Sequence, residues 1–264
     1  MSDRLTAERI APHLDTRWLG RALHVHDELD STNTTARELA AAGAADGTVV
    51  IAEAQRRGRG RLGRTWVSPA GKNLYLSVVL RSDLPVDRLS QISLLAGVAT
   101  CETVSEWVAA AIKWPNDVLV AGRKVAGLLA EMDGAGAARA VVLGIGVNLN
   151  STAEDFPDEL RDKAGSLRLA TGEVVDRARF AGRLLTRLEV RYEQLRRTGF
   201  AAVAEAWRQQ SNLIGRAIRV QEPGQIVAGT VLGIDEDGAL RLRRADGSEH
   251  RVVAGDVTVV DGYA

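Results

Sequence analysis

A segment rich in arginine and glycine, set between two apolar runs, constrains the fold of this chain more than any other feature. Residues 55–66 read Gln-Arg-Arg-Gly-Arg-Gly-Arg-Leu-Gly-Arg-Thr-Trp, between the apolar runs at 49–52 and 74–80. Neighbouring like charges repel, and glycine has no fixed backbone preference, so we expect this loop to be poorly ordered when empty. Guanidinium groups and backbone N–H groups together bind multiply charged anions. The segment therefore predicts a loop that orders around an anionic ligand or intermediate.

Arg-Gly segments also occur as solvated linkers and as nucleic-acid-binding tails. The position of this one between two apolar segments favours a ligand loop, because tails rarely lie inside a domain. The chain carries 34 Lys and Arg and 34 Asp and Glu residues, so its net charge gives no indication of a polyanionic partner. The basic character is local and lies mainly in residues 56–64.

The length of 264 residues allows one large domain and a small one. The single cysteine, Cys101, excludes an intramolecular disulfide and indicates a reducing compartment. Its apolar neighbours favour a packed thiol over a nucleophile. The sequence contains neither a signal-peptide stretch nor an apolar run of membrane-spanning length, so we expect a soluble cytoplasmic protein that is not bound to a membrane.

Several classes of site are excluded by the motifs that the sequence lacks. The four histidines form no metal-ligand pattern, which argues against a structural zinc or a Cys/His dyad. The sequence also lacks the G-x-x-x-x-G-K-[ST] loop of a P-loop nucleotide site. The pair Gly144 and Gly146 has neither the third glycine nor the following helix of a dinucleotide fingerprint, so we reject a Rossmann site.

Apolar periodicity predicts alternating strands and helices over most of the chain. Helices are expected from the Ser/Thr cluster at 31–35 to about 42, with Thr35 and Glu38 as a capping box, and at 87–110, 176–198 and 200–210. Gly43 and Gly199 are the expected stops of the first and third of these helices. Strands are expected at 22–29, 48–53, 73–80, 112–120, 124–132 and 140–149, the last three as an antiparallel meander.

The C-terminal region changes character. Short runs of alternating apolar residues are separated there by Asp237-Gly238 and Asp246-Gly247. Asp-Gly dipeptides are typical of hairpin turns, so we expect a small all-β domain, a partly open barrel. With a boundary near Asn212, the predicted domains are 1–212, including an N-terminal leader at 1–21, and 213–264.

A set of motifs follows in order along the chain: Ser31-Thr32-Asn33, Gly58-Arg59-Gly60-Arg61-Leu62-Gly63-Arg64-Thr65-Trp66, Lys113-Trp114-Pro115-Asn116-Asp117, Lys124-Val125-Ala126-Gly127-Leu128-Leu129-Ala130-Glu131 and Gly144-Ile145-Gly146-Val147-Asn148. With these motifs the chain resembles a biotin protein ligase over roughly residues 22–264. The resemblance implies an α+β fold. A mixed, largely antiparallel sheet with helices packed against it is followed by a small SH3-like β-barrel.

Bifunctional members of this family carry an N-terminal helix-turn-helix domain that represses biotin synthesis. Only residues 1–21 precede the expected catalytic region here, too few for that domain. The resemblance is therefore to the ligase-only form, and we expect no binding to specific DNA. Arg56 and Arg57 depart from the family pattern, which more often has uncharged residues there.

The resemblance implies a two-step, AMP-forming reaction. The carboxylate of biotin attacks the α-phosphate of ATP, with Mg²⁺, and gives biotinyl-5′-AMP and pyrophosphate. A lysine of a biotin carboxyl carrier protein domain, such as that of acetyl-CoA carboxylase, then attacks the activated carbonyl. The first step depends on alignment and charge neutralisation more than on a nucleophilic side chain. The enzyme is expected to be a monomer or a homodimer.

By resemblance, Ser31, Thr32 and Asn33 meet the fused rings of biotin. A ureido group offers one acceptor and two donors, which small hydroxyl and amide side chains suit. The same residues also fit a helix N-cap, and both roles can hold together. Gln55 is expected to border the biotin site, and Gly127 to allow close backbone approach, although a glycine in a strand can also mark a bulge.

The loop and one lysine carry the expected chemistry. By resemblance, Arg59, Gly60 and Arg61 close over the carboxylate and phosphate and keep water from the mixed anhydride. Lys124 is the predicted main catalytic residue, with its ammonium near the biotin carboxylate and α-phosphate. Without the neighbouring motif, it would be interpreted as an exposed turn lysine. Arg64 is expected to help bind ATP.

The nucleotide side is expected to consist of Lys113, Asn116 and Asp117. Asp117 either positions Mg²⁺ through water or holds a hydroxyl. Asn148 either contacts phosphate or metal or is a buried structural amide. The resemblance assigns no metal-ligating residue.

Two other functions compete with this one. A ligase for lipoate or octanoate on a related fold is the nearer alternative, although the Gly-Arg-Gly-Arg and Lys-Trp-Pro-Asn-Asp segments favour biotin. A nucleic-acid-binding module would use the Arg-Gly loop and the barrel, and it predicts strongly salt-dependent oligonucleotide binding. Acidic residues at 235–237 and the lack of an aromatic platform in the barrel argue against it.

Overall fold

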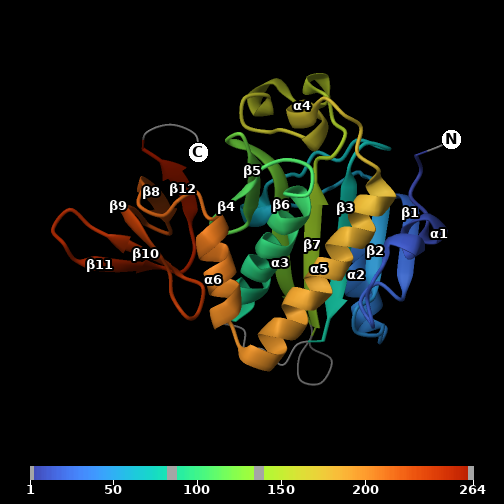
Figure 1. Cartoon of the computed structure of the whole chain (residues 1–264), viewed down its shortest axis with the longest axis horizontal. Helices are drawn as coiled ribbons and strands as arrows, with labels where there is room; N and C mark the ends of the chain where they lie inside the picture. Colours follow the sequence, from blue (N-terminus) through green and yellow to red (C-terminus); the bar gives the residue numbers. More distant parts are fainter. Residues whose placement is uncertain (1–2, 82–87, 134–139, 261–264) are drawn as a thin grey trace.

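A seven-stranded mixed sheet, with the order β1-β2-β3-β7-β6-β5-β4, carries the larger part of the chain (Figure 1). The structure is a computed structural model that describes residues 3–81, 88–133 and 140–260. Neighbouring strands pair antiparallel except β1 with β2, which are parallel. The strands are β1 (Leu23–Leu29), β2 (Val49–Gln55), β3 (Leu74–Leu80), β4 (Ala111–Lys113), β5 (Asp117–Val120), β6 (Arg123–Asp133) and β7 (Ala140–Val147). The predicted mixed, largely antiparallel sheet is confirmed.

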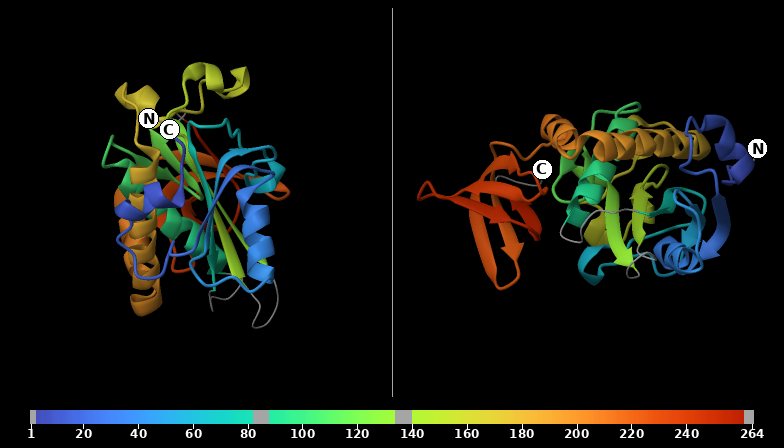
Figure 2. Two further views of the ribbon diagram at one scale, coloured as in Figure 1. Left: turned by 90° about the vertical axis from the view of Figure 1, so that its right-hand side faces the viewer. Right: turned by 90° about the horizontal axis from the view of Figure 1, so that it is seen from below.

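Helices cover both faces of this sheet (Figure 2). The long helices α3 (Leu89–Val104) and α5 (Arg177–Thr198), with α6 (Ala201–Gln210), lie on one face, and α2 (Thr32–Ala41) lies on the other. Strand β2 shows the two layers directly, because Val49 and Ile51 join the large core while Val50 joins a separate cluster under α2. A strand with helices on both sides is apolar on both sides, which explains its unbroken apolar sequence.

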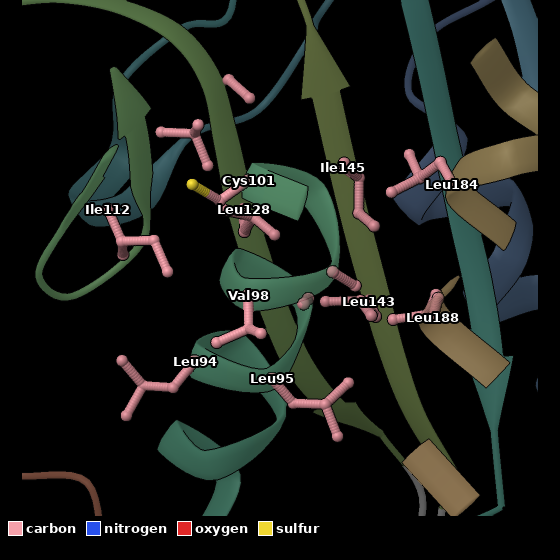
Figure 3. Packing of buried hydrophobic residues seen from close by; sticks show 14 of the residues in the cluster. Leu94, Leu95, Val98, Cys101, Ile112, Leu128, Leu143, Ile145, Leu184 and Leu188 are labelled. Carbon is pink, nitrogen blue, oxygen red and sulfur yellow. The ribbon is translucent and has the colours of Figure 1, made fainter. Parts of the chain in front are cut away.

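The large core is packed around α3. Its apolar residues reach toward β6 and β7 on one side and toward α5 on the other, as Figure 3 shows for Leu95, Leu128, Leu143 and Leu188. Cys101 lies in this core, and burial raises the pKa of its thiol to about 12. A thiol with so high a pKa is not a nucleophile near neutral pH.

The segment ahead of β1 is tied into this core. It contains the short helices α1 (Ala7–Ile10) and η1 (Ala11–His13), and it buries Leu5, Ile10 and Leu19.

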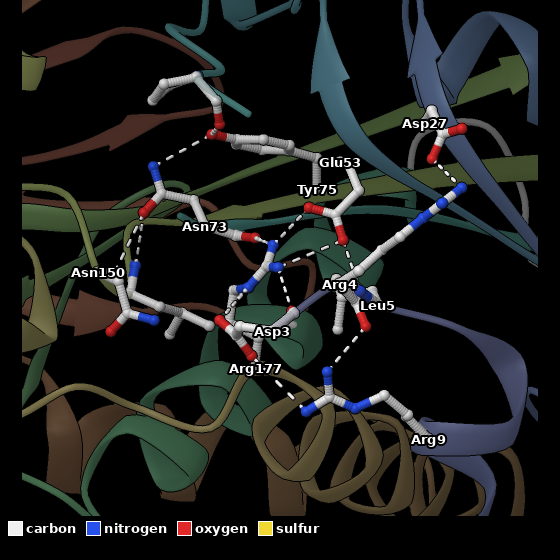
Figure 4. A network of polar contacts seen from close by, with 12 residues as sticks. Asp3, Arg4, Leu5, Arg9, Asp27, Glu53, Asn73, Tyr75, Asn150 and Arg177 are labelled. Atoms are coloured by element: carbon white, nitrogen blue, oxygen red, sulfur yellow. Dashed lines mark hydrogen bonds and ion pairs between the residues drawn. The ribbon is translucent and has the colours of Figure 1, made fainter. Parts of the chain in front are cut away.

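A buried ion cluster holds this N-terminal segment against β2 and α5 (Figure 4). The guanidinium of Arg177 in α5 is 1% exposed and donates to Glu53 at 2.8 Å and to Asp3 at 2.9 Å. The backbone N–H of Leu5 donates to Glu53 at 2.5 Å. The predicted leader is therefore packed into the larger of the two sheet-containing parts.

Three local expectations are corrected. Residues 112–120 form two strands, β4 and β5, because the chain folds back at Pro115 and pairs Lys113 with Asp117. The helix expected at 87–110 ends at Val104, with residue 87 outside the described residues. Trp107, which extended the apolar pattern in the sequence, lies in a turn after the helix. It packs there on Phe180, with ring centroids 5.2 Å apart.

The third correction concerns the start of α2. The helix begins at Thr32 with Ser31 as its N-cap, so Thr35 and Glu38 lie inside it and form no capping box. The Ser31 side chain makes no cap hydrogen bond.

The C-terminal region is a five-stranded antiparallel sheet with barrel-like curvature, and its order is β11-β10-β9-β8-β12. Its strands are β8 (Ala217–Glu222), β9 (Gln225–Ile234), β10 (Leu240–Arg243), β11 (Glu249–Val252) and β12 (Asp256–Val259). Gly238 and Gly247 have φ values of +87° and +83° in the turns before and after β10. The small all-β domain and its Asp-Gly turns are confirmed.

The turn between β9 and β10 joins this domain to the larger one. The indole N–H of Trp114 donates to the Gly238 carbonyl at 3.1 Å, and Ser90 and Gln91 of α3 donate to the two preceding carbonyls. A Cβ at Gly238 would lie 2.6 Å from Leu94 Cδ1. The turn therefore fits closely against α3 and is joined to the β4–β5 hairpin through Trp114. Among the described helices, none is long and apolar enough to cross a membrane.

Candidate active site

A cavity of about 560 Å³ lies beneath the Arg-Gly loop, residues 56–66. Its walls come from the start of α2, the ends of β2 and β3, the strands β6 and β7, the β4–β5 hairpin and β12 of the barrel. The cavity brings together every residue predicted to contact biotin or ATP: Ser31, Thr32, Asn33, Gln55, Arg59, Gly60, Arg61, Arg64, Lys113, Asn116, Asp117, Lys124, Gly127 and Asn148.

Hydroxyl and amide groups form one end of the cavity. Gln55 accepts hydrogen bonds from the backbone N–H of Thr32 at 2.9 Å and from its hydroxyl at 3.2 Å. Ser31, Thr32 and Asn33 are nearly buried, and the Ser31 hydroxyl is not used for capping. This end therefore offers both donors and acceptors to a small polar ring.

Ser77 of β3 supports this end of the cavity from behind, and the motifs did not indicate it. It is fully buried, and its Oγ lies 2.8 Å from Thr32 Oγ1 and 2.6 Å from Asn33 Oδ1. The available signal was a single serine in the apolar run of residues 74–80. Buried polar side chains are hydrogen-bonded almost without exception, so a lone serine in a buried strand indicates a partner.

Glycines of β7 make room for side chains that lie flat on the sheet. A Cβ at Gly144 would collide with Asn33 Oδ1, and one at Gly146 would lie 2.6 Å from the indole of Trp66. A Cβ at Gly127 of β6 would lie 2.9 Å from Trp66 and 3.1 Å from Lys124 Cε. These glycines serve close packing in the cavity floor, and Trp66 covers two of them.

Arginines fasten the Arg-Gly loop to three different parts of the structure. Arg59 donates to Glu131 of β6 at 2.7 Å, and Arg61 donates to Asn116 in the β4–β5 turn at 3.2 Å. Arg64 forms an ion pair with Asp256 at the start of β12. The loop thus spans the cavity from the central sheet to the barrel.

Short backbone bonds shape the loop between these points. Gly60 N–H donates to the Arg64 carbonyl at 2.7 Å, and Trp66 N–H donates to the Gly58 carbonyl at 2.9 Å. Leu62 lies at the tip with φ of +55° and is 73% exposed.

Lys124 and Asp117 lie side by side in the cavity. The Lys124 Nζ is 2.6 Å from Asp117 Oδ1 and 5.5 Å from the centroid of Trp66. The backbone of Lys124 is fixed on its outer edge, where its N–H donates to the Lys163 carbonyl and its carbonyl accepts from Gly165 N–H. The ammonium is therefore held at a defined place between an aromatic ring and a carboxylate.

Further cationic groups surround this pair. Burial lowers the pKa of the Lys113 ammonium, and the nearby Lys124 lowers it further, whereas Asp117 and Asp256 act in the opposite direction. Burial also lowers the pKa of the Arg61 guanidinium, which remains charged because its ordinary value is so high. Positive charge with limited hydration binds phosphate groups strongly.

Asparagine side chains support the walls. Asn116 donates to the Leu128 carbonyl at 2.8 Å, and Asn148 donates to the Gly165 carbonyl at 3.0 Å. The Asn148 amide thus holds the wall next to Lys124, and its contact with phosphate or metal stays a prediction. Phe156 is buried and also lines the cavity.

The described residues contain no group of three His, Cys, Asp or Glu side chains that could hold an ion. Asp117 supplies one carboxylate to the cavity beside Lys124. One or two carboxylates completed by substrate phosphates are a usual donor set for Mg²⁺, whereas zinc and calcium take most of their ligands from the protein. The side chains present therefore fit Mg²⁺ bound together with a nucleotide.

Comparisons with known proteins all identify similarity to one family. Residues 25–148 match the Biotin/lipoate A/B protein ligase family, and residues 213–260 match the Biotin protein ligase C terminal domain. The chain is 40% identical over 275 residues to a biotin--[acetyl-CoA-carboxylase] ligase of Mycobacterium tuberculosis, covering 97% of this chain and 98% of that protein. It is 39% identical over 247 residues to the bifunctional ligase/repressor BirA of Bacillus subtilis, covering 92% and 76% respectively.

A solved structure gives the same result. The structure of biotin protein ligase from Aquifex aeolicus in complex with biotin and ATP superimposes with a TM-score of 0.79. It shares 27% sequence identity, and the match covers 90% of this chain and 98% of that one.

Proposed function

The chain belongs to the biotin protein ligase family, and from this premise we propose which of its residues activate biotin with ATP and transfer the biotinyl group to a lysine of a carrier protein. The observation that carries the proposal is the position of Lys124. Its ammonium lies beside Asp117 in a cavity that has hydroxyl and amide groups at one end and an arginine-rich loop as its roof.

The polar end of the cavity is proposed to bind the ureido ring. Ser31, Thr32 and Asn33 offer hydroxyl and amide groups, and Gln55 and Ser77 fix two of them by hydrogen bonds. Trp66, which packs closely on Gly127 and Gly146 of the floor, is proposed to offer an aromatic surface to the second ring and the valeryl chain. The carboxylate of biotin would then reach Lys124.

In the first step, a carboxylate oxygen of biotin attacks the α-phosphorus of ATP. A C–O–P bond forms, the bond between the α-phosphorus and the bridging oxygen breaks, and pyrophosphate leaves. Lys124 and Arg61 neutralise the two approaching anions, which otherwise repel each other. Lys113 and Asn116 lie where the nucleotide phosphates are expected. When bound, Mg²⁺ supplies further neutralisation of the phosphates, and Asp117 is the residue proposed to hold it.

In the second step, the neutral amine of a carrier lysine attacks the carbonyl carbon of biotinyl-5′-AMP. An amide bond forms, and AMP leaves. The Arg-Gly loop is proposed to cover the intermediate until the carrier arrives, because water would otherwise hydrolyse the mixed anhydride. The proposed acceptor is the biotin carboxyl carrier domain of a carboxylase, in line with the name of the Mycobacterium tuberculosis relative.

We also propose a cellular location and an oligomeric state for this enzyme. A cytoplasmic location accords with the single, buried Cys101. The proposed enzyme acts as a monomer or a homodimer without binding specific DNA.

Lipoate and octanoate are the substrates to exclude. Neither carries a ureido group, so both would leave the Ser31 hydroxyl and the remaining amide hydrogen of Asn33 unmatched by the ligand, and unmatched polar groups in a nearly buried site weaken binding. The match of residues 213–260 is to a biotin protein ligase domain, which also favours biotin.

Pyrophosphate release by the purified protein tests the proposal. ATP and Mg²⁺ are supplied with biotin, lipoate, octanoate or no acid. A biotin carrier domain is then added, and its intact mass is measured beside a carrier whose acceptor lysine is replaced by arginine. Biotin-dependent release and a biotinyl mass increase on the lysine carrier alone are expected. Release with lipoate or octanoate in place of biotin would move the substrate assignment, and no acid-dependent release would overturn the proposal.

A further inference from the structure

Glu131 ends the segment that begins with Lys124, and the chemistry above gives it no role. It lies on β6, and its side chain is 20% exposed. Its two carboxylate oxygens serve different parts of the site. Oε1 accepts from Arg59 of the Arg-Gly loop at 2.7 Å, and Oε2 accepts from the Asn33 amide at 2.9 Å and from Arg37 at 3.2 Å. One carboxylate therefore joins the roof of the cavity to the residue expected to meet biotin.

The Asn33 side chain is fixed by this arrangement. Its Oδ1 faces the Ser77 hydroxyl at 2.6 Å, and its Nδ2 donates to Glu131, which leaves one amide hydrogen for a ligand. Without the acidic partner, the amide has no acceptor on that side and is free to turn over. Glu131 thus determines which end of Asn33 is a donor toward the cavity.

The charge of Arg59 is also balanced by Glu131. Arg59 lies in a loop whose other cations are Arg56, Arg57, Arg61 and Arg64, so an unpaired guanidinium would be repelled by its neighbours. Charge-assisted hydrogen bonds are the stronger class of polar contact. The ion pair therefore ties Arg59 to β6, beyond Arg56 and Arg57, whose backbone N–H groups donate to the chain at the end of β1.

The second half of the loop is connected to the same floor through neutral groups. Gln55 donates to Ser68 Oγ at 2.9 Å, and Ser68 donates to the Trp66 carbonyl at 3.0 Å. Gln55 in turn accepts from Thr32, and Thr32 faces Ser77. Both ends of the Arg-Gly loop are thus linked to the polar end of the cavity, one through Glu131 and one through Gln55.

We propose that Glu131 is a positioning residue that couples occupancy of the biotin ring subsite to closure of the Arg-Gly loop. It acts through Asn33 and Arg59 and touches no substrate. This inference rests on the proposed function, because the contact of Asn33 with biotin and the covering of the intermediate by the Arg-Gly loop are proposed there. A loop that is released from Glu131 binds biotin less well and lets the activated intermediate escape. The charges that drive adenylation stay in place, because Lys124 lies on β6 and Arg61 keeps its own hydrogen bond to Asn116.

Glu131→Gln and Asp133→Asn form a matched pair. Asp133 lies two residues further along β6, and its carboxylate is 3.8 Å from Arg37 Nε. Both substitutions remove one negative charge from β6 near Arg37, and only Glu131 reaches Arg59 and Asn33.

Glu131→Gln is expected to raise the half-saturating biotin concentration about tenfold, because it weakens a charge-assisted contact. It should also raise the ratio of bystander-lysine to carrier-lysine labelling by about the same factor, with the maximal rate of pyrophosphate release changed less than about twofold. Asp133→Asn should resemble the wild type in all three measurements.

Arg59→Ala combined with Glu131→Gln should release no more intermediate than either change alone, because both remove the same contact. A merely structural role for Glu131 would lower thermal stability without changing the labelling ratio. An unchanged ratio and an unchanged biotin requirement in Glu131→Gln would overturn the proposal.

Limited trypsin digestion without ligands gives a readout that does not depend on catalysis. Cleavage after Arg59, followed by mass spectrometry, should be about tenfold faster in Glu131→Gln than in the wild type or Asp133→Asn. Equal cleavage rates in the three proteins would overturn the support of the loop by Glu131. If the wild type shows no biotin-dependent pyrophosphate release, the proposed function fails, and the digestion rates still decide whether Glu131 holds the loop.

Discussion

The ammonium of Lys124 lies 2.6 Å from the carboxylate of Asp117, so the central cation of the cavity is held in an ion pair. Both residues come from short, neighbouring stretches, Asp117 at the start of β5 and Lys124 near the start of β6. In the proposed function, an incoming carboxylate and phosphate would compete with Asp117 for the ammonium, and Asp117 would then be available to a divalent cation. The pair would thus link the binding of the anionic substrates to the proposed binding of Mg²⁺.

Lys124→Ala should fold normally and lose adenylation by two to three orders of magnitude, because one preorganised charge contact contributes about 3–4 kcal/mol. Biotin-dependent pyrophosphate release and circular dichroism test the two parts of this prediction. Lys124→Arg is the charge-conserving control. A loss of less than tenfold in Lys124→Ala would show that another group neutralises the phosphate.

Asp117→Asn should shift the Mg²⁺ requirement of the first step. The half-saturating Mg²⁺ concentration is expected to rise by about tenfold or more, because the carboxylate is a far better ligand for this ion than an amide. Biotin binding in the absence of ATP, measured by calorimetry, should stay near the wild-type value. An unchanged Mg²⁺ titration would remove Asp117 from the metal site.

Gly144→Ala should weaken biotin binding, because the added methyl group would occupy the place of Asn33 Oδ1. A loss of affinity of about tenfold is expected from displacing one buried polar contact. Gly97→Ala in α3 is the matched control, since its Cβ would meet only Ile112 Cγ2, at 3.8 Å. That change should leave biotin binding intact and stabilise the helix by about 0.5–1 kcal/mol. Equal biotin affinity in the two variants would contradict the proposed place of Asn33.

Arg177→Met should destabilise the catalytic domain by about 3–5 kcal/mol, because it leaves the nearly buried Glu53 without its partner. Arg183→Met on the same helix is the control. Its side chain is 48% exposed and pairs with Glu106, and surface ion pairs contribute about 0–1 kcal/mol. Urea unfolding followed by fluorescence measures both. Similar midpoints for the two variants would show that the ion cluster at the N-terminal segment contributes little to stability.

Much of the fold followed from local patterns. The strands β2 and β3 and the helix α5 are long segments with a strong apolar pattern. The Asp-Gly dipeptides predict turns because glycine readily adopts the positive φ that these turns require. The predicted strand at 112–120 failed because its apolar residues on either side of Pro115 belong to two strands that face the same core. Periodicity does not distinguish a straight strand from a tight hairpin when both bury the same side chains.

The candidate site also contains residues that the sequence predicts and residues that only the structure reveals. Residues such as Arg59 and Lys124 lie in contiguous sequence motifs, so they could be predicted as site residues from the sequence. Ser77 and Gly144 are neighbours only because β3 pairs with β7 in the register that sets them opposite each other. Asn33 then reaches the same place from α2 on that face of the sheet. Such roles arise from strand register and helix placement, which a single sequence does not specify.

The turn of the barrel that receives Trp114 has a consequence for genetics. The carbonyl of Gly238 holds the β4–β5 hairpin, and the same hairpin carries Asn116 and Asp117 into the cavity. A substitution at Gly238 would push against Leu94 and shift that hairpin. In a screen for growth that depends on high biotin, alleles of this C-terminal turn would therefore be grouped with alleles of residues 113–117, although the two lie more than a hundred residues apart in the sequence.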